Sequence, residues 1–374
     1  MGKLFNCVFD LGGSGTRTVN CAELDKVKLQ PSDIMEIPVD GKTDDTLEKW
    51  RYDIVIKDAP HKQLIGRRFV KGEAQSVNKG KPLQIVSGTL KVAQDSTYIA
   101  FAFAAASLVS KESVADATLN VGICIPAGES YEDKNIETLK ANTVGKWVIY
   151  YPNKGVTVKF DVLRTLAMAE GPIALMPYRA EFNSVFSSGD GFILDPGHRS
   201  SDVALILRGF IPDRDSAIPH PIAGNSIVDG LAISLLAKGH SLTREELYAA
   251  VETGCYKINN TVYPCGEIIR QSKKKFAGIL VDAMHMTLSK SFKTMDTIRW
   301  IAAIGRPFDT NLGEKDCNGD VIGKESPYYV GDLYEEILNI ININVMRVAI
   351  KNPEHGNVLG AAKALKAIIA KAKK

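Results

Sequence analysis

The chain has 374 residues, of which 45% are hydrophobic and 24% are charged, and it contains 31 glycines and 16 prolines. These proportions exclude disordered, collagen-like and low-complexity proteins. A formal net charge of +3 is too small to indicate a surface that binds nucleic acid. Because a single hydrophobic core stops growing at about 250 to 300 residues, the length predicts two lobes with a cleft between them.

Six cysteines are scattered along the chain, with no C-x-x-C pair and no histidine at zinc spacing. We therefore expect reduced cysteines that pack in the interior, rather than a metal cluster or a disulfide framework. The longest apolar run, 98–109, is shorter than the ~20 residues that span a bilayer, and the first residues fit no signal peptide. The sequence thus predicts a cytoplasmic protein without a membrane partner.

In the first half of the chain the pattern predicts strands followed by helices. Leu4–Phe9 is a short apolar strand that enters a glycine-rich turn, Asp10–Thr18, before a second strand resumes at Val19, which is typical of a β-hairpin. The later elements are a buried alanine-rich helix over 97–111, a central strand over 118–126, a polar helix over 133–142, a hairpin over 146–162 that turns at 153–155, and a Gly/Pro-punctuated connection over 168–177.

Near the middle of the chain the same order of features returns. Gly191–Leu194 is an apolar strand, Asp195–Asp202 is a turn, and Val203–Leu207 is apolar again. Since an aspartate ends the strand in both places, we interpret the two hairpins as an internal duplication with one copy in each lobe. Helices over 225–238, 243–253, 265–292, 332–341 and 357–374 and a strand over 298–304 complete the predicted elements.

The first glycine-rich turn carries the strongest chemical signal. A turn of Gly and Ser presents several backbone N–H groups to one point, which is how proteins hold phosphate oxygens. Asp10 would repel phosphate unless Mg²⁺ stood between them, so its place beside the turn indicates a metal–nucleotide held largely through metal-bound water. Arg17, on the strand that leaves the turn, could neutralise phosphate charge. A plain hairpin with glycines for positive φ and a solvated Arg17 are the alternatives.

Two such hairpins, one in each half, resemble the phosphate-1 and phosphate-2 motifs of the actin, Hsp70 and sugar-kinase superfamily. Ile301–Pro307 stands where that superfamily has its adenosine motif, a strand that ends in glycines, and Asn352–Ala361 resembles its second connecting motif. The resemblance implies an α/β, actin-like fold of two lobes, each a mixed sheet flanked by helices, with a nucleotide cleft between them. We expect the first lobe at 1–180 and 345–374, and the second at 181–344.

Within the superfamily, the chain most resembles the bacterial actin-like plasmid-segregation ATPases, the ParM and Alp group, over nearly its whole length. The order of segments from Val121–Pro126 through 131–142 and a hairpin to Met168–Ala174 is the most specific part. In that family the last segment carries the glutamate that positions the attacking water, so the resemblance implies that Glu170 is catalytic. Such a role is chemically reasonable, because phosphoryl transfer depends mainly on positioning. Without the family context, an exposed loop residue is the preferred interpretation of Glu170.

The resemblance also implies the remaining site residues. Asp10 and Asp195 would join Glu170 in catalysis and would hold hydrated Mg²⁺. The residues implied to bind ATP are Gly12, Gly13, Ser14, Gly15, Thr16 and Arg17 in the first motif, Gly197, His198, Arg199 and Ser200 in the second, and Gly305, Arg306 and Pro307 in the adenosine motif.

The second and third motifs depart from the family pattern. Residues larger than the usual ones stand in the second loop, where His198 and Arg199 either reach phosphate or point outward. The adenosine motif has a single glycine, Gly305, so GTP stays open beside ATP as the nucleotide. Arg306 either stacks on the base or pairs with phosphate.

The family resemblance implies an ATPase that polymerises into filaments with Mg²⁺-ATP, disassembles after hydrolysis and drives plasmid DNA segregation. Its partners would be further copies of itself and an adaptor protein on centromere-like plasmid DNA, and we expect no direct DNA binding. A sugar-type small-molecule kinase of the same superfamily is the alternative, although no carboxylate stands in a sugar-kinase-like context. A nucleotide-binding scaffold without turnover is the second alternative, because the second loop is altered.

Overall fold

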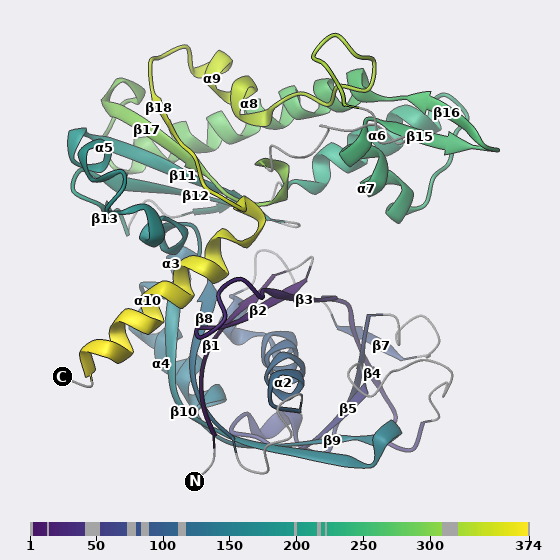
Figure 1. Cartoon of the computed structure of the whole chain (residues 1–374), viewed down its shortest axis with the longest axis vertical. Coiled ribbons are helices and arrows are strands. Elements are labelled where there is room, and N and C mark those ends of the chain that lie inside the picture. The colour runs from purple at the N-terminus through teal and green to yellow at the C-terminus, as the bar shows by residue number, and fades with distance from the viewer. Residues whose placement is uncertain are drawn as a thin grey trace. The chain divides into compact units, whose positions relative to one another are not determined.

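The structure is a computed structural model that describes residues 3–12, 15–41, 53–72, 80–83, 90–110, 117–197, 200–214, 218–220, 223–308 and 321–372. The chain divides into two compact units, which we call unit 1 (Met1–Pro177 and His355–Lys374) and unit 2 (Tyr178–Glu354). Each unit contains a mixed sheet with helices packed on it (Figure 1). The predicted α/β fold class is therefore confirmed.

Unit 1 contains a ten-stranded sheet. Its strands are β1 (Lys3–Leu11), β2 (Thr16–Asn20), β3 (Lys28–Gln30), β4 (Ile34–Ile37), β5 (Asp53–Asp58), β6 (Arg68–Lys71), β7 (Lys81–Leu83), β8 (Ala117–Ile125), β9 (Gly145–Tyr151) and β10 (Val156–Ala169). Its α-helices are α2 (Asp95–Ser110), α3 (Ala127–Ser130), α4 (Asp133–Thr143) and α10 (Gly356–Ala372), and short 3₁₀ helices occupy 62–64, 91–93, 152–154 and 172–178.

The sheet of unit 1, in the order β3-β2-β1-β8-β10-β9-β5-β6-β4-β7, curls around α2 (Figure 1). Every residue of α2 from Ser96 to Val109 is buried. A helix that is apolar on all sides must be enclosed, and the curled sheet provides that enclosure. Lys71 of β6 joins the two ends of the sheet, because its ammonium donates to Thr16 Oγ1 in β2 and to Gln30 Oε1 in β3, both at 3.2 Å.

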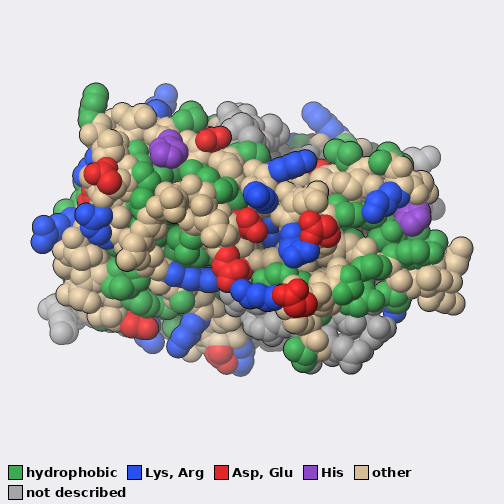
Figure 2. All heavy atoms as spheres, turned by 90° about the horizontal axis from the view of Figure 1, so that it is seen from above, with side chains coloured by type: hydrophobic (Ala, Val, Ile, Leu, Met, Phe, Trp, Pro, Cys, Tyr) green, Lys and Arg blue, Asp and Glu red, His purple; other side chains and the backbone are tan. Residues whose placement is uncertain are grey.

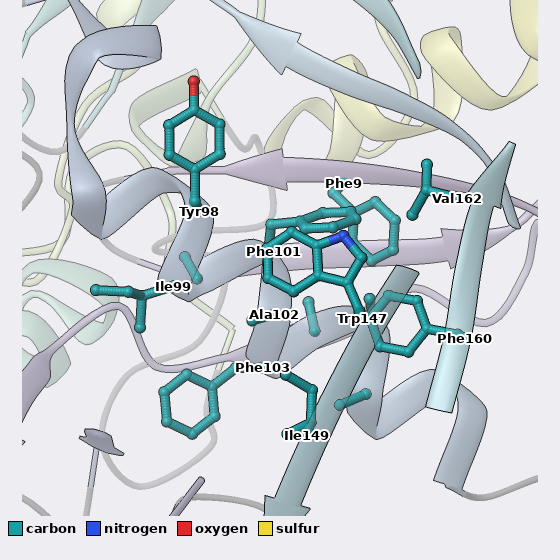
Figure 3. Close-up of a cluster of buried hydrophobic side chains, with 14 of the residues drawn as sticks. Phe9, Tyr98, Ile99, Phe101, Ala102, Phe103, Trp147, Ile149, Phe160 and Val162 are labelled. Atoms are coloured by element: carbon teal, nitrogen blue, oxygen red, sulfur yellow. The ribbon is translucent and has the colours of Figure 1, made fainter. Parts of the chain in front are cut away.

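Aromatic side chains fill the space between α2 and the strands around it. The ring of Phe101 on α2 lies 5.1 Å from that of Phe9 on β1 and 5.4 Å from that of Trp147 on β9, both edge to face (Figure 3). Trp147 also stacks on Phe160 of β10 and donates its indole N–H to Thr143 O at 2.9 Å. Aromatic pairs of this kind add about 0.5–1.5 kcal/mol each beyond burial. They hold β1, β9 and β10 in place around the helix.

Helix α10 packs on the strands β1, β2 and β8 in a second core cluster. Val358 and Leu365 of the helix pack there with Val8 of β1. The helix also lies close to the segment that follows β10, where a Cβ added to Gly360 would collide with Ile173 O. This close packing fixes the chain just beyond the end of β10, where the predicted catalytic glutamate lies.

Unit 2 contains a six-stranded sheet and a separate two-stranded hairpin. Its strands are β11 (Asp190–Pro196), β12 (Ser201–Leu207), β13 (Ile211–Pro212), β14 (Ile218–His220), β15 (Cys255–Ile258), β16 (Thr261–Pro264), β17 (Ile298–Ala303) and β18 (Met346–Val348). Its α-helices are α5 (Asn183–Ser188), α6 (Asn225–Leu236), α7 (Arg244–Thr253), α8 (Gly266–Lys290) and α9 (Leu333–Ile341), with 3₁₀ turns at 295–297, 306–308 and 353–355.

The two units begin with the same strand order. In unit 1 the hairpin β1–β2 has β3 on its outer side, and β8 and β10 follow on the other side, parallel to β1. In unit 2 the order is β13-β12-β11-β17-β18, in which β17 runs parallel to β11, and β18 to β17. This shared order supports the predicted duplication of a hairpin-led unit.

Most of the predicted helices and strands are present, with ends displaced by a few residues. The main difference concerns the two hairpins, whose predicted turns, Asp10–Thr18 and Asp195–Asp202, are shorter in the structure. The strands continue through Leu11 and Pro196, and the returning strands begin at Thr16 and Ser201. Only Gly12–Gly15 and Gly197–Ser200 remain as loops, so Asp10 and Asp195 are strand residues with fixed cross-strand partners.

The cysteines of the described residues are packing residues. Cys7, Cys21, Cys124, Cys255 and Cys265 are buried thiols that form no disulfide, and Cys317 lies outside the described residues. Burial raises the pKa of the Cys21 thiol to about 11, which makes it a poor nucleophile at neutral pH. Among the described residues, no helix is both long and apolar enough to cross a bilayer.

Candidate functional site

The first predicted phosphate loop is a four-residue connection between β1 and β2. Asp10 lies two residues before the loop and pairs across the hairpin with Arg17, which lies two residues after it. A Cβ added to Gly12 would lie 3.1 Å from Gly15 O, 3.7 Å from Arg17 Nη1 and 3.9 Å from Asp10 Oδ1. The glycine backbone, a guanidinium and a carboxylate thus converge on one point. Gly13 and Ser14 lie outside the described residues.

Asp10 lies at one edge of three parallel strands. In the register of the sheet, Asp10 of β1 stands beside Cys124 of β8, which in turn stands beside Met168 of β10. All three positions are at the carboxyl ends of their strands, the edge at which open α/β sheets bind their ligands. Glu170 follows β10 directly, and its N–H donates to Ile125 O at 2.9 Å. The fold therefore brings Asp10 and Glu170 to the same edge of unit 1.

The residues after Glu170 fix its position. Gly171 has a φ of +79°, a conformation that favours glycine. Its N–H donates to Asn357 Oδ1 at 2.8 Å, at the start of α10. Asn357 belongs to the segment that resembles the second connecting motif, so this motif anchors the loop that carries Glu170.

Lys91 is a buried lysine that pairs with Glu170, and no sequence motif pointed to it. Its ammonium forms an ion pair with Glu170 and donates to Cys124 O at 3.0 Å. Burial alone would lower the pKa of Lys91, but the negative charges of Glu170 and Asp10 raise it well above the ordinary value, so the ammonium stays protonated. A lone lysine in a short turn before a helix is usually a surface residue, and the sequence offers no signal that would have distinguished it.

The second predicted phosphate loop has the same length as the first. Pro196 pairs with Ser201, and Gly197–Ser200 connect them. A Cβ added to Gly197 would lie 3.0 Å from Ser200 O, close to the corresponding 3.1 Å between Gly12 and Gly15. The start of the loop is fixed by the segment before α6, because Gly224 N–H donates to Gly197 O at 3.1 Å. His198 and Arg199 lie outside the described residues.

The predicted adenosine motif lies against the end of β11, directly before the second loop. Gly305 has a φ of +90°, and a Cβ there would lie 2.9 Å from Pro196 O and 3.7 Å from Asp195 Oδ1. Pro307 lies beside Gly224, where a Cβ would come within 2.8 Å of the proline ring. Asp195, the second loop and the adenosine motif therefore form one site within unit 2.

Arg306 is engaged by a residue that the sequence motifs did not indicate. Its guanidinium forms an ion pair with Glu252 near the end of α7, and about half of the arginine side chain is exposed. Glu252 thus fixes the direction of Arg306 beside Gly305. Glu252 stands nine residues after the N-cap Thr243 and belongs to no motif, so only the three-dimensional structure reveals the pair.

Comparison with known proteins gives likeness in structure only. No family model matches the chain, and no curated protein matches its sequence. The actin-like protein Alp7A has a TM-score of 0.74 at 16% identity, with 99% of this chain and 98% of that one covered. Ta0583, an archaeal actin homolog solved in complex with ADP, has a TM-score of 0.67 at 16% identity and 97% and 99% coverage. A 15-stranded ParM filament from Clostridium botulinum has a TM-score of 0.61 at 14% identity and 98% and 100% coverage.

These likenesses extend over nearly the full length of each chain and define the fold as actin-like. They confirm, at the level of fold, the predicted resemblance to the ParM and Alp proteins. The described residues contain no group of three or more His, Cys, Asp or Glu side chains that could hold a metal ion by themselves. A metal at Asp10 or Asp195 would therefore need oxygen ligands from a bound phosphate or from water.

Proposed function

We propose that the chain is an ATPase that binds ATP with Mg²⁺, polymerises into filaments and disassembles after hydrolysis. The observation that carries the proposal is the group at the carboxyl edge of unit 1, where Asp10 and Arg17 lie beside Gly12 and Glu170 follows β10 at the same edge. Fixed donors for phosphate, a metal-binding carboxylate and a carboxylate for water are the parts that phosphoryl transfer requires.

Each unit contributes one phosphate loop. In unit 1 the backbone of Gly12–Gly15 would face the phosphates and Arg17 would offset their charge, whereas the predicted phosphate contact of the Thr16 side chain is not supported, because its hydroxyl is buried and accepts from Lys71. In unit 2 the backbone of Gly197–Ser200 would do the same, with Asp195 and Gly305 beside it. The two loops share their length and the close approach between their first and last residues, which supports a common role.

Asp10 and Asp195 fit a hydrated Mg²⁺ ion. Carboxylate oxygen is the ligand that Mg²⁺ prefers, and the ion usually keeps several waters and takes further ligands from substrate phosphates. Asp10 is 8% exposed at the end of its strand, beside the glycine loop. When bound, the ion would neutralise charge on the phosphates, while the chain's own residues position the nucleotide.

Glu170 would orient the attacking water. Its carboxylate lies at the same sheet edge as Asp10, and its backbone is fixed by Ile125 and, through Gly171, by Asn357. Orientation of water by a fixed carboxylate is worth about 10²–10⁴ in rate. ATP is the proposed nucleotide. GTP is the alternative nucleotide, because Arg306 of the adenosine motif and its partner Glu252 form no pattern that selects a base.

Filament formation and plasmid segregation extend the proposal to partners. The ParM structure from Clostridium botulinum is a filament, and this chain has the same fold. The face in Figure 2 carries acidic and basic side chains intermixed, without a continuous patch of one sign. With a formal net charge of +3, this distribution favours DNA reached through an adaptor protein rather than direct contact, in the cytoplasm of a plasmid-bearing bacterium.

Light scattering and phosphate release, followed together after mixing the protein with Mg²⁺-ATP or Mg²⁺-GTP, test the proposal. We expect scattering to rise and phosphate to follow, and Glu170→Ala to give polymer that persists because it hydrolyses slowly. Glu137→Ala, at an exposed position of α4 paired with Lys140, is the matched control and should behave as the unchanged chain does. ADP production that depends on an added sugar, without scattering, would identify a kinase. Scattering without phosphate release would identify a scaffold.

A further inference from the structure

Lys91 is a buried lysine that is held by hydrogen bonds at its backbone and by an ion pair at its side chain. It lies in the 3₁₀ turn Lys91–Ala93 that precedes α2, and its side chain is 8% exposed. Lysine is rarely buried to this extent, because removal of an ammonium from water is costly unless opposite charge and hydrogen bonds compensate. Here the Glu170 carboxylate and the Cys124 carbonyl provide the compensation.

The backbone of Lys91 is clamped from two elements. Glu129 of α3 accepts the N–H of Lys91 at 2.8 Å and the N–H of Val92 at 3.2 Å. Thr97 of α2 donates its hydroxyl to Lys91 O at 2.6 Å, and Tyr98 donates to Val92 O at 2.5 Å. The pKa of Glu129 is raised, mainly by its burial, which shows how far this carboxylate is withdrawn from water.

The clamp determines where the ammonium can be. A lysine side chain has four flexible bonds and normally samples many rotamers, so fixing it costs conformational entropy. With its backbone fixed by Glu129 and Thr97 and its head bound to Cys124 O, Lys91 places its charge at one point at the end of β8. That point is within an ion-pair distance of Glu170 and within the electrostatic reach of Asp10.

We propose that Lys91 is a positioning residue that holds the Glu170 carboxylate in the orientation in which it binds the attacking water. The inference rests on the function proposed above. A carboxylate has two oxygens, so one can accept from Lys91 while the other is directed to water. The charge-assisted bond is stronger than a neutral one, and Glu170 is thereby restricted to a narrow range of orientations before nucleotide binds.

The arrangement differs from a purely structural ion pair in one respect. A structural pair would stabilise the fold, and its loss would lower the melting temperature without separating hydrolysis from binding. A positioning pair acts on hydrolysis through Glu170, so its loss lowers the rate of the chemical step and leaves ATP affinity nearly unchanged. The effect must also vanish when Glu170 is absent, because Lys91 then has no carboxylate to orient.

The test is a double-mutant cycle on single-turnover phosphate release, with ATP affinity measured in parallel for the full chain. We expect Lys91→Met to lower the release rate by about 30-fold while ATP affinity changes by less than about threefold. In the Glu170→Ala background, Lys91→Met should cause no further loss. Lys273→Met is the matched control, because Lys273 is an equally buried lysine of α8 that donates to a backbone carbonyl, Gly331 O at 2.7 Å; it should keep the release rate of the unchanged chain.

Thr97→Val provides a second variant if Lys91→Met does not fold. It removes only the hydroxyl that holds Lys91 O, keeps the side-chain volume, and should lower the release rate by about threefold at an unchanged ATP affinity. An unchanged release rate in Lys91→Met or in Thr97→Val would overturn the role proposed for Lys91. So would an equal loss of rate from Lys91→Met with and without Glu170. Neither outcome would overturn the proposed function. Absence of phosphate release from the unchanged chain would overturn both the proposed function and this inference.

Discussion

The two units share a strand order but differ in the side chains they place at equivalent positions. In unit 1 the aspartate that ends the first strand, Asp10, pairs across the hairpin with Arg17, whereas Asp195 in unit 2 pairs with another aspartate, Asp202. Unit 1 adds the buried Lys91–Glu170 pair beside its aspartate. Unit 2 instead adds a second glycine turn at Gly305.

This difference indicates that the two units, although they share a strand order, have different roles in the proposed reaction. The first and last residues of the hairpin loop approach each other almost equally closely in the two units, so we expect both loops to hold phosphate in the same way. Among the described residues, the Lys91–Glu170 ion pair is found in unit 1, whereas in unit 2 the backbone of Gly305 closely approaches Pro196. We therefore expect substitutions in unit 1 to affect hydrolysis and equivalent substitutions in unit 2 to affect binding.

The largest contrast should come from the two aspartates. Asp10→Asn removes a negative charge that interacts electrostatically with Lys91. We expect the rate of phosphate release to fall about 100-fold, which corresponds to roughly 2.7 kcal/mol of activation free energy. Asp195→Asn should reduce release about tenfold, mostly through weaker Mg²⁺-nucleotide binding. Steady-state phosphate release at several Mg²⁺ concentrations distinguishes the two. Equal losses in both variants would mean that the units are chemically equivalent.

A second contrast concerns the glycines on the central strands. A Cβ at Gly191 of β11 would lie among the ring atoms of Trp300, which is fully buried, whereas a Cβ at Gly122 of β8 would meet Met168 Cε at 3.1 Å and Val8 Cγ2 at 3.2 Å. We expect Gly191→Ala to destabilise unit 2 by about 2 kcal/mol and Gly122→Ala to destabilise unit 1 by about 1 kcal/mol, since methionine can yield and a buried indole cannot. Hydrogen exchange, measured on peptides from each unit, gives the two values separately. A larger loss from Gly122→Ala would contradict the packing described here.

The third prediction is a pH dependence of the stability of unit 1. Burial lowers the pKa of Lys71 to about 7, and its hydrogen-bond partners Thr16 and Gln30 are uncharged. The unfolded chain keeps this proton to about pH 10.5, so between pH 7 and pH 10 it binds more protons than the folded chain, and stability must rise with pH. The difference in free energy of unfolding between the unchanged chain and Lys71→Met should therefore change by about 1 kcal/mol per pH unit in this range, in favour of the unchanged chain as the pH rises. Denaturant titrations at pH 7, 8 and 9 give this difference, and a difference independent of pH would show that Lys71 is charged in the folded protein.

The smallest effect is expected at the ion pair of unit 2. Arg306 is half exposed, and exposed ion pairs contribute about 0–1 kcal/mol. Arg306→Ala and Glu252→Ala should each change ATP affinity by no more than about threefold, while the hydrolysis rate of bound ATP stays the same. Equilibrium titration with a fluorescent ATP analogue measures this. A selective gain in GTP binding would instead assign the pair to base recognition.

Strong local patterns made much of the fold predictable from the sequence. The hairpin glycines mark both turns, and a helix without any polar face, over 97–111, can only be an enclosed core helix. The strands β3 to β7, β13 to β16 and β18 were not predicted, because they are two to six residues long and most mix polar and apolar positions. Their pairing is set by the sheet around them, which no local pattern contains.

The candidate site was predictable only where residues carry a motif. Asp10 and the glycine loops follow from the hairpin pattern and Glu170 from the family resemblance, and the structure brings Asp10 and Glu170 to one edge of unit 1. Lys91 was missed because it stands 79 positions before its partner and in no pattern. Its role depends on hydrogen bonds with Glu129 and Thr97, which lie elsewhere in the sequence. The residues next to Lys91 in the sequence are no different from those next to a solvent-exposed lysine.

The central claim is that the group in unit 1 performs the chemical step, and single-turnover hydrolysis by Glu170→Ala tests it most directly. Protein in excess over Mg²⁺-ATP is quenched at timed intervals, and ATP affinity is measured on the same preparation. We predict that the hydrolysis rate falls about 100-fold, with the dissociation constant for ATP within about threefold of that of the unchanged chain. Hydrolysis at the unchanged rate in Glu170→Ala would contradict the assignment of the reaction to this edge of unit 1.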